Sequence, residues 1–226
     1  MEKKQSLAQK VNIMRAAVMG ANDGILSVAG IVIGVASATN NNYAIFLAGI
    51  AGMLAGTVSM AMGEYVSVNA QKDAQKKAII QQKAILAANY DEEVLFVKEK
   101  YQQKGINPTL AAKAATEMMQ KDPLLTSIRE HFGFDIHEFT SPYAAAVSSM
   151  ISFPLGSVLP LTAITLLPIS IKIAATFISV IVALAITGFI AAVLGNSNRK
   201  KSILRNTISG VITMLVTYGI GTLIGR

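Results

Sequence analysis

The chain of 226 residues contains no cysteine and no tryptophan, and only 6% of its residues are aromatic. Without cysteine there is no disulfide bond, no thiolate metal site and no thiol chemistry. Charged residues are also scarce, at 15%, whereas 52% of the residues are hydrophobic and the mean hydropathy is +0.49. Soluble domains carry about 25% charged residues. The composition is therefore atypical of a soluble domain and favours a membrane protein.

Five apolar stretches are long enough to cross a membrane. About 20 helical residues, each rising about 1.5 Å, span the hydrocarbon layer of a bilayer. The first stretch is not a cleaved signal peptide, because it is too long, carries Asp23 and is followed at once by a second span. We predict an all-α polytopic membrane protein with spans at Ala16–Ala38, Tyr43–Val68, Tyr143–Leu166, Ser170–Leu194 and Ile203–Ile224.

Positive charge is distributed unevenly around these spans. It gathers before the first span and between the fourth and fifth, at Lys3, Lys4, Lys10, Arg15, Arg199, Lys200, Lys201 and Arg205. The positive-inside rule then places the N-terminus in the cytoplasm and, after five crossings, the C-terminus outside. Topology and contact with anionic membrane lipid account for the net charge of +7, so no nucleic-acid partner is expected.

The spans divide the chain into three parts, residues 1–68, 69–141 and 142–226. The middle part is predicted to be a small helical insert on the cytoplasmic side, holding ten of the thirteen acidic residues. Its first helix continues the second span over residues 69–89, and Asp91–Lys104 follows, ended by Gly105. Pro108 begins the next helix, and Asp122 caps a short fourth one.

Glycines at four-residue spacing indicate how the first two spans pack. The pairs are Gly20 with Gly24, Gly30 with Gly34, and Gly52 with Gly56. Such spacing lets helices approach closely, within one protomer or between two. Packing without any role in transport accounts for the glycines equally well.

Two carboxylates lie inside the apolar stretches, Asp23 in the first and Glu64 near the end of the second. An ionisable side chain at membrane depth is costly and usually faces a pathway, a partner or a cavity. Met60 shares a helix face with Glu64, and the antiparallel spans bring it to the depth of Asp23. Carboxylate oxygens and a softer thioether sulfur suit a divalent transition metal. Because carboxylates titrate, metal entry can be coupled to proton exit.

Each of these residues also has a simpler interpretation. Glu64 can reach water at the membrane rim, or pair with Arg15 or Lys72. Asp23 can be structural, and Met60 can be a flexible core side chain.

Segments along nearly the whole chain resemble the vacuolar iron transporter family, including its bacterial and nodulin-like members. They are GANDGILSVAGIVIGVA, LAGTVSMAMGEYVSV, EMMQKD, FPLGSVLPLTAI and TYGIGTLIG. Their order, the five spans and the insert after the second span together make the resemblance specific. No catalytic motif interrupts that order, so the chain is not expected to be an enzyme or to hold a cofactor.

The resemblance implies a homodimer in the cytoplasmic membrane of a bacterium-like cell. It would carry Fe²⁺, and also Mn²⁺ or Co²⁺, out of the cytoplasm in exchange for protons. The family's route lies between the first two spans, along the dimer interface, where its Asp matches Asp23 and its Met matches Met60. An additional acid of some members falls at Gly52, which cannot bind metal, and Glu64 is expected to take over part of that role.

The resemblance also implies metal ligands in the insert. Family members collect metal there with glutamates and with a Met-Met pair followed by an acid. The candidates in this sequence are Asp91, Glu92, Glu93, Glu117, Met118, Met119 and Asp122. Alternatively, the acids form a solvated helix face, and the insert binds metal weakly or mainly supports the dimer. His131 and His137 are six residues apart and are expected at the surface.

Two other functions remain open from the sequence. A membrane-anchored metal sensor or scaffold would bind metal through the insert without transport. A transporter of another substrate, such as a small organic cation, would not depend on Met60 or show competition among Fe²⁺, Mn²⁺ and Co²⁺.

Overall fold

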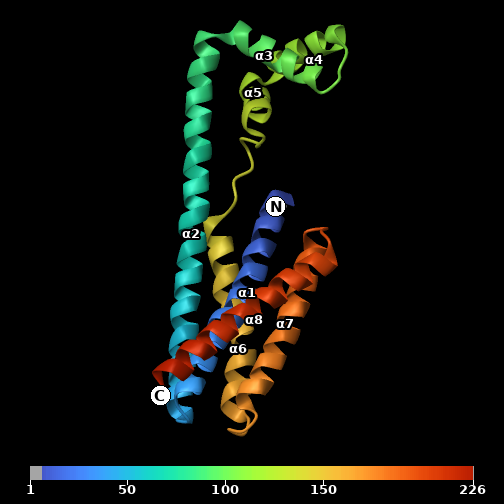
Figure 1. The fold of residues 1–226 in the computed structure, drawn as a ribbon. Coiled ribbons are helices and arrows are strands. Elements are labelled where there is room, and N and C mark those ends of the chain that lie inside the picture. The colour runs from blue at the N-terminus through green and yellow to red at the C-terminus, as the bar shows by residue number, and fades with distance from the viewer. Residues whose placement is uncertain (1–6, 226) are drawn as a thin grey trace, which may run out of the picture. The chain divides into compact units, whose positions relative to one another are not determined.

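The computed structural model describes residues 7–225, which form eight helices and no strand (Figure 1). In chain order the helices are α1 (Leu7–Ala38), α2 (Asn42–Ala88), α3 (Tyr90–Gln103), α4 (Pro108–Lys121), α5 (Pro123–Phe132), α6 (Pro142–Leu166), α7 (Lys172–Leu194) and α8 (Arg199–Ile224). Five of them, α1, α2, α6, α7 and α8, are long and apolar enough to cross a membrane. The prediction of an all-α protein with five candidate membrane-spanning helices is confirmed.

Two spans begin earlier than the sequence predicts. The helix predicted from Ala16 begins at Leu7, and the one predicted from Ile203 begins at Arg199. The side chain of Asn198 accepts a hydrogen bond from the Lys201 backbone N–H at 3.2 Å and so caps the start of α8. Polar residues thus extend both helices beyond the apolar stretches that hydropathy detects.

The chain divides into two compact units. We call residues 10–67 and 141–225 the membrane unit, and Val68–Thr140 with residues 7–9 the insert unit. The helix α2 runs through the boundary as one helix of 47 residues, which confirms the prediction that the second span continues into the insert. Each unit has its own apolar core.

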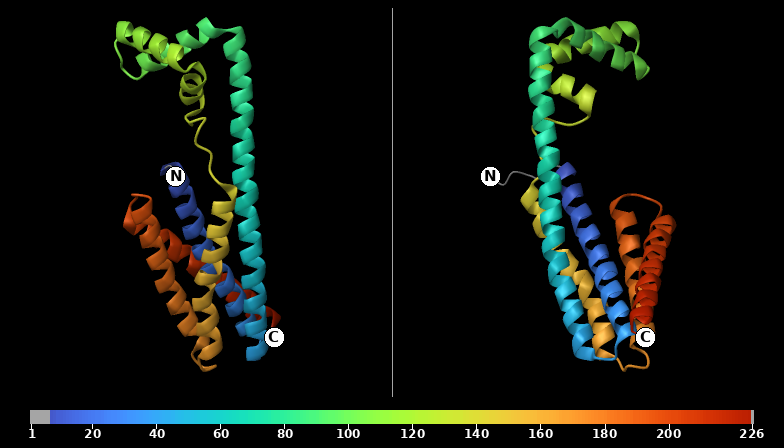
Figure 2. Two further views of the ribbon diagram at one scale, coloured as in Figure 1. Left: turned by 180° about the vertical axis from the view of Figure 1, so that it is seen from behind. Right: turned by 60° about the vertical axis from the view of Figure 1, so that its left-hand side comes forward.

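In the membrane unit, α1 lies between α2 and α6 on one side and α7 and α8 on the other (Figure 2). On one side, Val28 and Val32 of α1 pack with Phe153 of α6. On the other side, Ile33 packs with Met214. Both faces of α1 are therefore fixed, and its polar residues point in directions set by this packing.

Glycines bring α1 and α6 into backbone contact. A Cβ at Gly24 would overlap the carbonyl oxygen of Phe153, and a Cβ at Gly156 would overlap that of Ala21. The Ser157 hydroxyl donates to the Gly24 carbonyl at 3.2 Å. The close approach predicted from the α1 glycines thus occurs within one chain, and α6 runs continuously through its two prolines.

The insert unit packs α3 and α4 around Val97, Tyr101, Ala115 and Met119. Its helix ends follow the sequence signals. Gly105 has a φ of 87°, Pro108 begins α4, and the Asp122 carboxylate accepts a hydrogen bond from the Leu125 N–H at 2.9 Å at the start of α5.

Candidate functional site

A cavity of about 560 Å³ lies between α1 and α2 of the membrane unit. Its polar lining comprises Arg15, Asp23, Ser27, Ser59, Glu64 and Ser67, and its thioethers are those of Met19 and Met60. The three intramembrane residues singled out from the sequence, Asp23, Met60 and Glu64, therefore line one cavity. Met19 and the three serines are additional lining residues that the sequence reasoning did not select.

Asp23 is directed into the cavity by its neighbour Asn22. The Asn22 side-chain oxygen accepts hydrogen bonds from Asn206 of α8 at 3.1 Å and from Thr187 of α7 at 3.4 Å. Successive helical residues point about 100° apart, so fixing Asn22 against α7 and α8 turns Asp23 toward α2. One Asp23 oxygen accepts a hydrogen bond from Ser27 at 2.9 Å, which leaves the other oxygen available to a ligand.

Met60 is half-buried and contacts the core cluster around Val32 and Phe153 while it also lines the cavity. It therefore fits both interpretations given above, core side chain and cavity side chain. A Cβ at the neighbouring Gly56 would overlap the Phe153 ring. The glycine thus admits Phe153 as the apolar wall beside the Met60 thioether.

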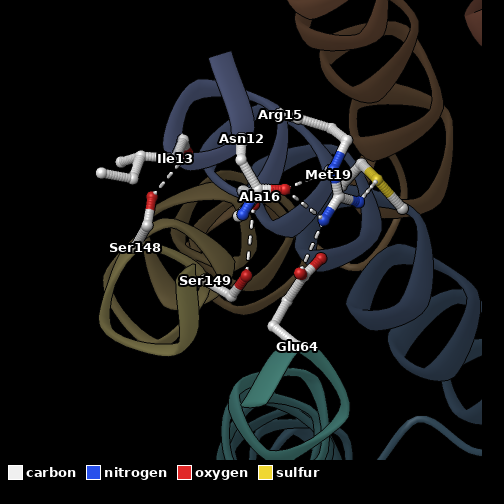
Figure 3. A network of polar contacts seen from close by, with 8 residues as sticks. All are labelled: Asn12, Ile13, Arg15, Ala16, Met19, Glu64, Ser148 and Ser149. Atoms are coloured by element: carbon white, nitrogen blue, oxygen red, sulfur yellow. Dashed lines mark hydrogen bonds and ion pairs between the residues drawn. The ribbon is translucent and has the colours of Figure 1, made fainter. Parts of the chain in front are cut away.

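Glu64 is largely buried, with only 7% of its side chain exposed. Its Oε2 accepts a hydrogen bond from Arg15 Nη2 at 2.8 Å, so α1 and α2 are joined by a salt bridge at this end of the cavity (Figure 3). The pairing with Arg15, one of the alternatives from the sequence, is therefore present. Breaking such a pair leaves a buried charge uncompensated.

No group of three or more histidine, aspartate or glutamate side chains is arranged to hold a metal ion anywhere in residues 7–225. Within one chain, a metal ion in the cavity would depend on two carboxylates supplemented by thioether sulfur and serine hydroxyls. Such a mixed set is weaker than a closed site of four strong ligands, and weak binding suits an ion that must leave again.

The acids of α3 separate into two kinds. Asp91 and Glu92 are exposed, as a solvated helix face requires. Glu93 is buried, and its Oε2 accepts hydrogen bonds from Gln82 at 2.8 Å and from Ser127 at 2.5 Å. The three candidate acids therefore do not converge, and Glu93 lies in the interior of the insert unit.

His131 is a surface residue, as expected, but one side of its ring contacts the same network. Its Nε2 lies 3.0 Å from Glu93 Oε2, and its ring stacks on Phe96 with centroids 3.8 Å apart. The side chain is 27% exposed. The spacing of His131 and His137 could not predict the contact between His131 and Glu93, because the partners of His131 come from other helices.

The remaining candidate metal ligands of the insert lie in three different environments. Met118 and Asp122 line a cavity of about 340 Å³ together with Lys121 and Arg129. Met119 is fully buried in the core and is not part of that lining. Glu117 is exposed, 3.9 Å from Lys113.

The Met118 thioether is already engaged as a hydrogen-bond acceptor. It accepts from the Tyr101 hydroxyl at 3.0 Å. Burial raises the pKa of the Tyr101 phenol, and the neighbouring Glu130 carboxylate raises it further, so this donor stays protonated. The cations of Lys121 and Arg129 around Asp122 and Met118 also disfavour a divalent ion at this cavity.

We predict that Glu93→Ala destabilises the insert unit, whereas Glu92→Ala does not. The first substitution leaves the buried Ser127 hydroxyl without its acceptor, while the Gln82 amide keeps only its bond to Ser127 at 2.6 Å. A buried polar group left unsatisfied costs about 1–3 kcal/mol. The second removes an exposed side chain one position away. Hydrogen exchange of the full chain in detergent, followed in peptides of α3 and α5, measures the difference. Equal protection in the two variants would contradict a structural role for Glu93.

Comparison with known proteins gives consistent matches over the chain. The model of the VIT family matches residues 14–222. The chain is 33% identical over 224 residues to a protein named vacuolar iron transporter from Acanthamoeba castellanii, covering 98% of this chain and 82% of that protein. It is 32% identical over 226 residues to vacuolar iron transporter homolog 3 of Arabidopsis thaliana, covering 99% and 89%. It is 33% identical over 213 residues to vacuolar iron transporter homolog 1 of rice, Oryza sativa subsp. japonica, covering 94% and 74%.

Proposed function

The chain belongs to the VIT family, and from that premise we propose that it exports Fe²⁺ from the cytoplasm in exchange for protons. Members of this family are membrane transporters of iron and other metals, not enzymes. Mn²⁺ and Co²⁺ are proposed as further substrates, because their ligand preferences lie close to those of Fe²⁺. The metal is cargo here, so no resident cofactor is required.

The observation that carries the proposal is the convergence of Asp23, Met60 and Glu64 on one cavity between two apolar helices. Carboxylates are rare at membrane depth and usually mark an ion pathway. A small organic cation could pair with the two acids but would not need the thioether, and an uncharged substrate would need neither. The combination of hard oxygen and soft sulfur favours Fe²⁺ and Co²⁺ over Mg²⁺ and Ca²⁺, and the carboxylate oxygens also suit Mn²⁺.

Proton exchange follows from the chemistry of the same carboxylates. A carboxylate can hold either a proton or a divalent cation, and the two compete for the same oxygen atoms. Metal binding at Asp23 therefore expels a proton, and proton binding from the other side expels the metal. The positive residues near the N-terminus and at the start of α8 orient the N-terminus toward the cytoplasm. Export is proposed as the direction of metal movement from the resemblance to the family.

We also propose that the working protein is a homodimer with α2 at its interface. Small residues repeat every four positions on the exposed face of α2, at Ala51, Ala55, Ser59, Gly63 and Ser67. A Cβ on Gly63 would meet no atom within 4 Å, so this face is free to accept another helix at close range. Ala55, Ser59, Gly63 and Ser67 also line the cavity, and a second copy would close the cavity on that side.

The proposal is tested by reconstituting the chain in liposomes that contain a pH dye and a metal-sensitive dye. We expect Fe²⁺ movement across the membrane with proton movement in the opposite direction, both absent from liposomes without protein. Co²⁺ and Mn²⁺ should compete with Fe²⁺, and a small organic cation should not. Metal binding without flux from correctly inserted protein would instead favour a membrane-anchored sensor or scaffold.

A further inference from the structure

Arg15 makes three kinds of contact at one end of the α1–α2 cavity. Its Nη2 donates to Glu64 at 2.8 Å, and its Nη1 donates to the thioether sulfur of Met19 at 3.0 Å. Its Nε and Nη2 also donate to the side-chain oxygen of Asn12, at 3.3 and 3.2 Å. Figure 3 shows the guanidinium between Met19 on its own helix and Glu64 on α2.

The two atoms joined by this guanidinium, a carboxylate oxygen and a thioether sulfur, are of the same types that Asp23 and Met60 offer deeper in the cavity. A thioether is a weak hydrogen-bond acceptor but a good ligand for a borderline transition metal. Met19 lies one helical turn from Asp23 and lines the same cavity. The positive group of Arg15 thus stands where a divalent cation would find an oxygen and a sulfur ligand together.

We propose that Met19 and Glu64 form a second metal site in the cavity, and that Arg15 competes with the transported ion for it. The inference rests on the proposed transport function and adds an entry site to it. A divalent ion approaching Glu64 displaces the guanidinium and gains the thioether of Met19 in the same step. When the ion moves on toward Asp23, the guanidinium returns and compensates Glu64 again.

Burial explains why the exchange can occur without leaving Glu64 unpaired. The Glu64 side chain is 7% exposed, so its charge needs a cation beside it throughout. The Arg15 side chain is 44% exposed, so the guanidinium can withdraw toward water and keep its bonds to Asn12. The cavity has one other acid, Asp23. Among the described residues that line the cavity, Arg15 is the only cationic one.

The backbone beneath Arg15 is held in place while its side chain is exposed. Ser148 and Ser149 of α6 donate to the carbonyl oxygens of Ile13 and Ala16, at 3.0 and 3.2 Å. Figure 3 shows both of these bonds. The competing cation is therefore attached to a fixed helix and moves only by side-chain rotation, which takes place in nanoseconds for exposed residues.

The test is equilibrium binding of Co²⁺ and Mn²⁺ to the full chain in lipid nanodiscs. Arg15→Gln should tighten Co²⁺ binding about tenfold, the size of effect expected on removing a competing charged partner. The gain should vanish when Glu64→Gln is added. The matched control, Lys10→Gln, removes a positive charge from the same helix and should leave the affinity unchanged.

Met19→Leu provides a second variant that keeps every charge and a similar side-chain volume, so its folding does not depend on the Arg15–Glu64 pair. It should weaken Co²⁺ binding severalfold and leave Mn²⁺ binding nearly unchanged, because Mn²⁺ gains little from a thioether. Equal effects on the two ions would overturn the assignment of Met19 as a ligand.

The outcomes separate this inference from the transport proposal. The proposed competition between Arg15 and the metal ion would be overturned if Arg15→Gln left Co²⁺ binding unchanged or weaker. It would also be overturned if Arg15→Gln still tightened Co²⁺ binding in the presence of Glu64→Gln. Transport through Asp23 would stand in both cases. A chain that binds Co²⁺ neither as wild type nor as Arg15→Gln would overturn both.

Discussion

Asp23→Asn is expected to abolish coupled metal and proton movement in proteoliposomes, lowering metal flux at least about 100-fold. Asparagine has nearly the same shape and still accepts the hydrogen bond that Ser27 donates to Asp23 at 2.9 Å, so the fold should be retained. It has no negative charge to attract a divalent ion and no proton to exchange. Metal flux and internal pH, recorded together from the same liposomes, measure both losses.

Asp73→Asn is the matched control for this experiment. It makes the same chemical change on α2, at a side chain that is 74% exposed in the insert unit. Its flux should equal that of the wild type. Wild-type flux in the Asp23→Asn variant would remove Asp23 from the pathway, and metal flux that continues without proton movement would separate ion binding from coupling.

The spans and helix ends could be predicted from the sequence because local rules determine them. A backbone in hydrocarbon must satisfy its own hydrogen bonds, so each long apolar stretch becomes a helix. Pro108 begins α4, the Asp122 side chain caps the start of α5, and Gly105 takes the positive φ that follows α3. The early starts of α1 and α8 were missed because polar residues extend a helix without adding hydropathy.

The convergence of Asp23, Met60 and Glu64 could also be predicted, since four-residue spacing and antiparallel spans fix their face and depth. The choice among the partners of Glu64 could not be made from sequence, because Arg15 precedes it by 49 residues and the pairing depends on how α1 is rotated. That rotation is set by Asn22, through contacts with α7 and α8 more than 160 residues later in the chain.

The buried network of the insert was beyond sequence reasoning for the same reason. Gln82 and Ser127 are 45 residues apart, and His131 is 38 residues from Glu93. A run of acids such as Asp91, Glu92 and Glu93 gives no indication of which one faces inward. Family resemblance indicated metal ligands here, whereas hydrogen bonding to three neighbours gives Glu93 a structural role in this chain.

Gly24→Ala is expected to destabilise the membrane unit strongly, whereas Gly219→Ala is expected to leave it intact. A Cβ at position 24 overlaps the carbonyl oxygen of Phe153, a backbone atom that cannot rotate away. Overpacking costs about 1–3 kcal/mol when side chains can adjust, and occasionally more, so a clash with backbone should reach or exceed the upper value. Unfolding by sodium dodecyl sulfate, followed by circular dichroism, measures the loss.

Gly219→Ala in α8 is the matched control, because its Cβ would meet no atom within 4 Å and alanine favours a helix by up to about 1 kcal/mol over glycine. Gly24→Ala should also reduce metal flux beyond its effect on stability. Gly24 adjoins Asp23, so pushing α1 away from α6 moves the carboxylate relative to Met60. A Gly24→Ala variant as stable and as active as Gly219→Ala would mean that α1 and α6 are not in backbone contact, and the orientation of Asp23 would then need another cause.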